Sequence, residues 1–336
     1  MDNDGTLMWM KKWMKCAALG LAVLGLVTAG CGQQAQQGEK TYKVGIVQLV
    51  EHSSLDDANR GFVDGLKERG YEEGKNLAID RQNAQADQSN LQNIVQRFIS
   101  DKVDLICAIA TPSVQSAANA TKEIPIVGTA VTDYVSAKVV QSSEMPGGNV
   151  TGTSDMSPIS DQIDLLLKLY PNAKTIGTIY SSSEVNSEIQ VKEMTEYAAA
   201  KGLTVRTATI STVNDIPQAA QSLVSDVDVF YEPSDNVIAS AMPTLVSVTD
   251  PAGKGVICAA STMVAAGGLA TYGIDYYKLG VQTGEMAADI LEGKRKPSEM
   301  KIETARDLMV VINKKNAAKL GLTIPDEVLQ GATIVE

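Results

Sequence analysis

One order of elements occurs twice along this chain and constrains its fold more than any other feature. Between residues 42 and 131, β-rich runs at 42–48, near Ile79, at 103–110 and at 124–131 alternate with segments of helical periodicity. The order strand, helix, strand, helix, strand, polar loop, helix, strand returns between residues 175 and 260. Strands that alternate with helices indicate a parallel sheet covered on both faces. We therefore predict an α/β protein with two similar, doubly wound parallel-sheet lobes.

The segment after the second repeat predicts how the lobes are joined. A short strand at 269–274 runs into a helix that opens near Asp275, with apolar residues spaced at a helical period. If this strand belongs to the second lobe and the helix covers the first, the chain crosses a hinge between them. We expect Asp275 at the back wall of the cleft, and a three-strand hinge with crossings near 133–152, 270–276 and 298–308. The predicted lobes are residues 41–135 plus 275–298 and residues 136–274 plus 299–336.

The start of the chain differs in composition from the rest. Three lysines precede an uncharged run at 16–29, which is short for a membrane span and typical of the apolar region of a signal peptide. The run ends in Val-Thr-Ala-Gly directly before Cys31, an order that resembles the bacterial lipoprotein cleavage motif. We predict a signal peptide at 1–30, lipid on Cys31 and a flexible, polar tether at 31–40. An ordinary secretory signal with an incidental cysteine is the alternative.

Composition narrows the classes of partner and chemistry. The formal net charge is −11, and removing residues 1–30, with three Lys and two Asp, takes it to −12. An acidic protein is a poor partner for nucleic acid or anionic lipid. Cys107 and Cys258 fall within predicted strands of different halves, so we expect two buried thiols. His52 is the only histidine, and no zinc-site spacing or cofactor motif accompanies it, so we expect neither metal nor cofactor.

Polar clusters follow most of the predicted strands. In open α/β sheets, ligands bind beyond the carboxyl ends of the strands. Helix N-termini that face one cleft also supply N–H donors for a carboxylate, although the same residue types commonly cap helices. The clusters are His52-Ser53-Ser54, Thr111 with Ser113, Thr132-Asp133, Ser181 to Glu184, Ser234-Asp235-Asn236 and Ser261-Thr262.

No catalytic constellation accompanies these clusters. No G-x-S-x-G elbow flanks a serine, and neither a Walker loop nor a G-x-G-x-x-G fingerprint follows the first strand. A serine triad would need His52 as its base. We therefore predict a binding protein and not an enzyme.

Three blocks of sequence resemble a known family. They are residues 151–158 (TGTSDMSP), 232–243 (EPSDNVIASAMP) and 267–280 (GGLATYGIDYYKLG). These blocks are similar to the ABC-transporter substrate-binding lipoproteins associated with tryptophan and tyrosine uptake. The resemblance implies a type I periplasmic-binding-protein fold that closes on an amino acid, with permease and ATPase subunits as partners. We also expect a monomer, which the lipid on Cys31 would anchor on the extracytoplasmic face of the membrane.

Related amino-acid binding proteins imply roles for individual residues. Hydroxyls after the third and fourth strands would hold the ligand carboxylate, here Thr111, Ser113 and Thr132. For the ammonium we favour Asp235 or Asp275, with Asp155 third, while Asp275 is equally suited to be a helix N-cap. Four tyrosines are candidates to line the pocket for the ligand side chain (the ring pocket): Tyr134, Tyr180, Tyr231 and Tyr276. The full predicted set is His52, Ser53, Thr111, Ser113, Thr132, Asp133, Ser154, Asp155, Ser181, Ser182, Asp235, Asn236 and Asp275.

The ligand and the role leave alternatives open. The strand ends supply polar groups for the two charged poles of an amino acid, and the resemblance implies an aromatic one first. A branched-chain amino acid or another small polar solute comes next. A sugar is disfavoured, because sugar sites usually stack the sugar ring on a large aromatic side chain. Both tryptophans of this chain lie in the predicted signal peptide. A surface adhesin or a ligand sensor on the same fold is the alternative role, and an extracellular enzyme is a distant third.

Overall fold

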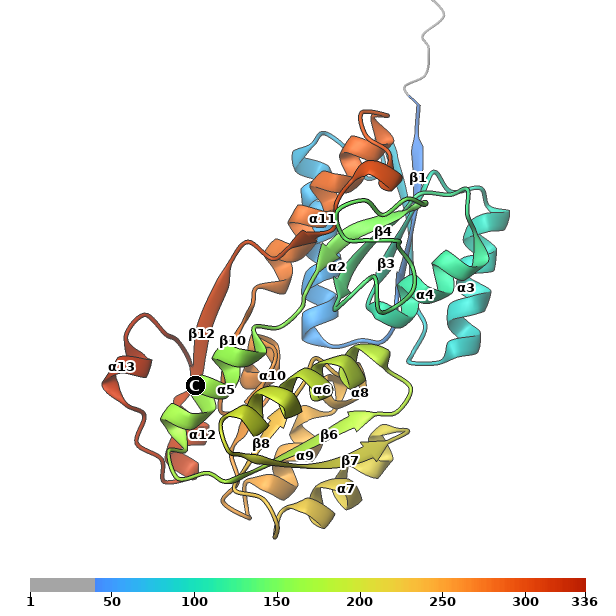
Figure 1. Cartoon of the computed structure of the whole chain (residues 1–336). Coiled ribbons are helices and arrows are strands. Elements are labelled where there is room, and N and C mark those ends of the chain that lie inside the picture. Colours follow the sequence, from blue (N-terminus) through green and yellow to red (C-terminus); the bar gives the residue numbers. More distant parts are fainter. Residues whose placement is uncertain (1–39) are drawn as a thin grey trace, which may run out of the picture. The chain divides into compact units, whose positions relative to one another are not determined.

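A computed structural model describes residues 40–336, and these residues form two lobes, each centred on its own sheet (Figure 1). The predicted signal peptide, Cys31 and nearly all of the tether lie outside the described residues. The first sheet has the order β11-β5-β4-β3-β1-β2, and all of its strands are parallel. Its strands are β1 (Tyr42–Gln48), β2 (Leu77–Asn83), β3 (Leu105–Ile109), β4 (Ile126–Val131), β5 (Val150–Ser154) and β11 (Glu303–Thr304).

The second sheet has the order β13-β12-β10-β9-β8-β6-β7. β12 pairs antiparallel with β10 and carries the parallel strand β13, while the other pairs are parallel. The strands are β6 (Thr175–Ser181), β7 (Thr204–Ile210), β8 (Val229–Glu232), β9 (Val256–Cys258), β10 (Ala270–Ile274), β12 (Leu308–Asn313) and β13 (Thr333–Val335). Two parallel-sheet lobes are therefore confirmed, with β12 and β13 as an addition that the sequence had not suggested.

Helices cover both sheets. Around the first sheet, α2 and α11 pack together on one side, and α3 and α4 lie on the other (Figure 1). These four are α2 (Ser53–Glu68), α3 (Gln88–Ser100), α4 (Thr111–Ala120) and α11 (Tyr276–Leu291). The second lobe contains α5 (Ile159–Leu169), α6 (Val185–Ala200), α7 (Ile216–Leu223), α8 (Asn236–Ser240), α9 (Met242–Thr249), α10 (Ser261–Ala265), α12 (Lys314–Lys319) and α13 (Asp326–Leu329).

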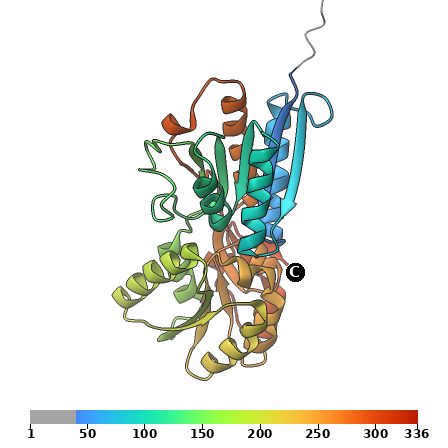
Figure 2. The same cartoon turned by 90° about the vertical axis from the view of Figure 1, so that its right-hand side faces the viewer.

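The chain passes between the sheets three times, and the lobe boundaries at the first and last passages come later in the sequence than predicted. β5 and β11 pair within the first sheet, so the chain crosses after Ser154 and after Thr304. The crossing after Thr304 lies within the range of 298–308 expected from the sequence, but the lobe boundaries were predicted at residues 135 and 298. The predicted boundaries are therefore corrected. The second crossing along the chain, at Asp275 between β10 and α11, lies where the sequence places it. Figure 2 shows the same two lobes from the side.

Glycines bring α2 and α11 unusually close. A Cβ on Gly280 would lie 2.1 Å from the carbonyl oxygen of Ala58, and one on Gly61 would lie 2.0 Å from that of Tyr277. Real Cβ atoms do not approach carbonyl oxygens so closely, so only glycine permits this helix separation. The contact fixes α11 to the first lobe immediately after the crossing at Asp275.

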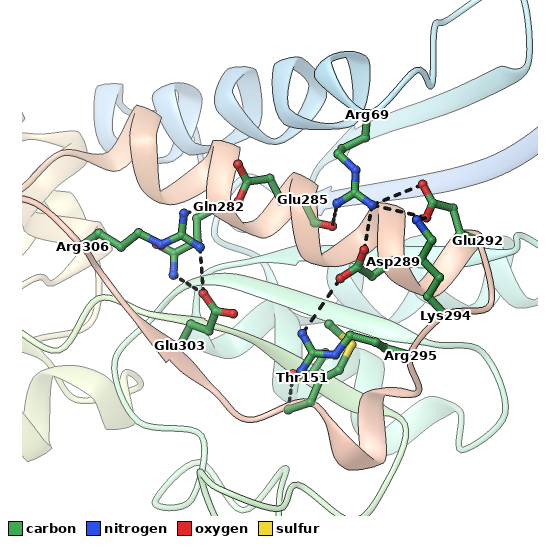
Figure 3. Close-up of polar contacts among 11 residues, drawn as sticks. Arg69, Thr151, Gln282, Glu285, Asp289, Glu292, Lys294, Arg295, Glu303 and Arg306 are labelled. Atoms are coloured by element: carbon green, nitrogen blue, oxygen red, sulfur yellow. Dashed lines mark hydrogen bonds and ion pairs between the residues drawn. The ribbon is translucent and has the colours of Figure 1, made fainter.

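Polar contacts reinforce the position of α11 along its length (Figure 3). Arg69, which follows α2, donates to Asp289 Oδ1 over 2.7 Å. Near the other end of the helix, Glu303 of β11 accepts from Gln282 over 2.6 Å and from Arg306 over 3.1 Å. These partly exposed polar contacts contribute little each, but they tie α11 both to α2 and to the crossing after Thr304.

Candidate functional site

A cavity lies between the carboxyl ends of the two sheets. It contains about 320 Å³ free of protein atoms, but only about 10 Å³ can hold the centre of a water molecule, so its walls are close together. Both lobes and the crossing segments contribute side chains. The lining residues are His52, Ser54, Leu55, Ala130, Thr132, Asp155, Asn186, Ser234, Asp235, Asn236, Ala239, Ala260, Met263 and Tyr276.

Three long helices begin at this cavity. α2, α6 and α11, each of 16 residues, contribute Ser54, Asn186 and Tyr276 from their first turns. The first backbone N–H groups of a helix have no partner within it, and the helix dipole makes this end positive. The cavity is therefore suited to an anionic group such as a carboxylate.

Two buried carboxylates beside the cavity are already saturated by protein donors. Asp235 accepts from the backbone N–H of Ile238 over 2.9 Å and of Ser181 over 2.7 Å, and from Ser187 Oγ over 2.7 Å. Glu184 accepts from the backbone N–H of Asn236 and from the amides of Asn186 and Asn236. Burial raises the pKa of Glu184 to about 8. These two groups hold the loop before α8 in place.

Asp155 is a third buried carboxylate, and it is less occupied. It follows β5 at the first crossing and is 3% exposed. Oδ2 accepts from the hydroxyl of Tyr276 over 2.7 Å, while Oδ1 has only a long contact of 3.4 Å from Thr132 Oγ1. Burial raises the pKa of Asp155 to about 6, against the smaller opposing effect of these hydrogen bonds. Its charge is therefore poorly compensated by the protein alone.

Direct hydrogen bonds connect the two lobes across the cavity. His52 Nε2 lies 3.1 Å from Asn236 Oδ1, and the hydroxyls of Ser54 and Thr262 are hydrogen-bonded. Gln190 Nε2 donates to Thr132 Oγ1 over 3.2 Å. Enclosure by the protein lowers the pKa of His52, which favours its neutral form. The lobes are thus in a closed arrangement.

Five of the residues predicted from sequence line this cavity. They are His52, Thr132, Asp155, Asp235 and Asn236, and they converge there from four separate segments of the chain. Of the four tyrosines considered for the ring pocket, only Tyr276 lines it. Tyr134 and Tyr231 instead donate within the cores, to the carbonyl of Thr153 and to Gln162.

The other predicted residues lie away from the cavity wall. Asp275 caps α11 by accepting from the N–H of Lys278 over 3.1 Å, so its position at the back wall is corrected. Asp133 accepts from Val135 and Ser136 in its own turn. The remaining six serve local structure or stand behind the wall: Ser53, Thr111, Ser113, Ser154, Ser181 and Ser182.

Sequence reasoning missed Asn186 and the apolar part of the lining. Leu55, Ala130, Ala239, Ala260 and Met263 carry no chemistry that would distinguish them from core residues. Ser54 and Ser234 belonged to the recognised polar clusters. Asn186 follows one of those clusters by two residues. This short distance from the end of a strand is the one feature of the sequence that indicates a place near the cavity.

Comparison with known proteins decides the family. The model of the family described as ABC transporter substrate binding protein matches residues 43–336. The chain belongs to this family. Within the described residues, no helix is long and apolar enough to cross a membrane, and no cluster of His, Cys, Asp and Glu is arranged to hold a metal ion.

Two characterised relatives cover almost the whole chain. A tyrosine-binding protein of Clostridioides difficile is 43% identical over 93% of both chains. A Streptococcus domain crystallised with L-Trp is 41% identical, with a TM-score of 0.85 over 88% of this chain and 100% of that one. Leucine-binding protein from Thermotoga maritima, 13% identical with a TM-score of 0.61 over 83% and 87% of the chains, shares the fold.

Another solved structure bears on the conformation. The ligand-free, open structure of a Clostridium difficile substrate-binding protein with adhesive properties is 44% identical over 88% of this chain and 99% of that one, yet its TM-score is 0.69. The L-Trp complex superposes better despite a slightly lower identity. The difference agrees with the closed arrangement indicated by the hydrogen bonds between the lobes.

Proposed function

We propose that this protein captures an aromatic amino acid, tyrosine or tryptophan, and delivers it to the permease of an ABC importer. The observation that carries the proposal is the pairing of one undercompensated carboxylate, Asp155, with three helix N-termini around a closed cavity. The ammonium of an amino acid would pair with Asp155, and its carboxylate would lie at the helix N-termini. The protein therefore offers one partner for each pole of a zwitterion.

The apolar lining supports a ligand with a large side chain. The walls have small side chains at Ala130, Ala239 and Ala260, which leave room for a ligand side chain. Apolar contact would come from Leu55 and Met263. With the lobes slightly further apart than in this structure, an aromatic ring would be buried against these residues. Such burial contributes a few kcal/mol beyond the charged poles. The names of the two aromatic-binding relatives support the same ligand class.

A binding role is also more consistent with the local chemistry than catalysis. His52, the only histidine, contacts an amide oxygen and not a nucleophile. We further propose that the chain acts outside the cytoplasm as a monomer anchored by lipid on Cys31. Its partners would then be the membrane, the permease and the ATPase, while nucleic acid is not expected to bind.

Calorimetry of the purified protein tests the ligand. We expect micromolar binding of tyrosine or tryptophan, about −8 kcal/mol, and at least tenfold weaker binding of leucine. Tight binding of a sugar with no response to any amino acid would overturn the proposal. Because one similar protein has adhesive properties, a surface adhesin is a second candidate role, measurable by attachment of the purified protein to cells.

A further inference from the structure

Asn186 has one unpaired acceptor at the wall of the cavity. The residue lies in the first turn of α6 and is 2% exposed. Its Nδ2 donates to Glu184 Oε2 over 2.9 Å and to the carbonyl of Ser234 over 3.1 Å. Its Oδ1 accepts no hydrogen bond from any group among the described residues. A buried acceptor without a donor costs free energy, so such atoms need an explanation.

The orientation of this amide is determined by its neighbours. Turning it over would bring Oδ1 against the carbonyl of Ser234, which can only accept, and would take Nδ2 away from both Glu184 and Ser234. The amide therefore keeps Nδ2 on these two groups. Oδ1 remains available as an acceptor, on a residue that lines the cavity.

We propose that Asn186 Oδ1 accepts a hydrogen bond from the ring of the ligand, either the phenol O–H of tyrosine or the indole N–H of tryptophan. This inference rests on the function proposed above, and it adds a specificity-determining residue. A neutral amide oxygen suits a neutral donor, while the charged ammonium is better matched by the carboxylate of Asp155. Phenylalanine, which has no such donor, would leave Oδ1 unpaired and would be rejected.

A second asparagine provides a matched control. Asn316 in α12 is also buried, and its Oδ1 also lacks a donor among the residues that the structure describes. Its Nδ2 donates to Asp250 over 3.0 Å, and it does not line the cavity. An unpaired acceptor alone therefore does not define a binding site, and Asn316→Ala should leave ligand preference unchanged.

The test measures two ligand pairs by calorimetry on the purified protein: tyrosine with phenylalanine, and tryptophan with 1-methyltryptophan. We expect the wild type to prefer the hydrogen-bond donor of at least one pair by about tenfold or more. Asn186→Ala should reduce that preference to about twofold or less, mainly by weakening the donor ligand. Asn316→Ala should retain it.

Three results would overturn the inference. Equal binding within both pairs by the wild type would do so without any variant, even if Asn186→Ala failed to fold. An equal loss for both members of a pair in Asn186→Ala would instead assign Oδ1 to the common amino-acid backbone. If none of the four ligands binds, the proposed function fails together with the inference.

Discussion

Replacing Asp155 by asparagine should change ligand affinity and stability in opposite directions. The carboxylate is buried at the first crossing, with the hydroxyl of Tyr276 at 2.7 Å from Oδ2 and only a long contact at Oδ1. Asparagine has nearly the same shape and can still accept from Tyr276. The substitution therefore removes the charge while disturbing the packing little.

The loss of affinity follows from the missing partner of the ammonium. A hydrogen bond to a charged group contributes about 1.5–3 kcal/mol, so we expect binding about 10- to 150-fold weaker. At constant pH this loss should appear for tyrosine, tryptophan and phenylalanine alike, because the ammonium is common to all three. In the wild type, affinity should fall as the pH drops through about 6, where Asp155 takes up a proton.

The gain in stability has a defined sign and pH range. The pKa of Asp155 is raised to about 6 in the folded protein, against about 3.9 in an unfolded chain. Between these values the folded state binds more protons, so stability falls as the pH rises, and the full cost is present above about pH 6. A difference of about two pH units corresponds to about 3 kcal/mol at most. Asp155→Asn should therefore unfold at a higher temperature than the wild type at pH 7.5, and at about the same temperature near pH 4.

Asp275→Asn is the matched control. It makes the same chemical change at the cap of α11, outside the cavity. Asparagine caps helices about as well as aspartate, so affinity should stay within about twofold. Calorimetry gives the affinities, and thermal unfolding without ligand at pH 7.5 and pH 4 gives the stabilities. Wild-type affinity in Asp155→Asn, or an Asp275→Asn variant that loses binding, would refute the assignment of the ammonium pole.

Three further predictions concern other regions of the chain. Cys31→Ala should release the protein from the membrane fraction or leave a longer precursor on a gel; unchanged anchoring and processing would contradict the lipoprotein hypothesis. Gly280→Ala should destabilise the protein to urea by about 1–3 kcal/mol, since its Cβ would lie 2.1 Å from the carbonyl of Ala58, whereas Gly148→Ala has open space and should be neutral. Saturating ligand should reduce the radius of gyration in small-angle scattering as the hinge closes, and an unchanged radius would count against closure.

The alternation of strands and helices could be predicted from the sequence because most of the strands are apolar. β1, β3 and β4 are rich in valine and isoleucine and are almost wholly buried. β5 was missed because its sequence is Val-Thr-Gly-Thr-Ser, although all five residues are buried. Its hydroxyls are satisfied inside the first lobe, where Thr151 donates to the carbonyl of Met300 and Thr153 pairs with Thr283. Tertiary hydrogen bonds of this kind leave no pattern in the sequence.

One break in a predicted helix could have been read directly. The second repeat predicts a single helix before its last strand, but this region is divided at Ala241 into α8 and α9. Pro243 lies in the first turn of α9, where its missing N–H costs nothing, and it could not lie inside a continuous helix. Apolar residues continue at helical spacing across this break, so their spacing alone predicts one helix.

The polar site residues were harder to rank, because residue type and position do not show how many donors each carboxylate already has. Asp155, Asp235 and Asp275 all follow strands, and all three were plausible partners for an ammonium. In the structure Asp235 accepts three short hydrogen bonds from protein groups. Asp275 caps an exposed turn, and only Asp155 combines burial with an underused oxygen. A carboxylate that the protein has already satisfied gains little from a ligand, whereas one that is buried and poorly compensated gains much. The free energy of burying Asp155 therefore opposes closure of the empty protein, and an ammonium that enters the cavity would remove this opposition.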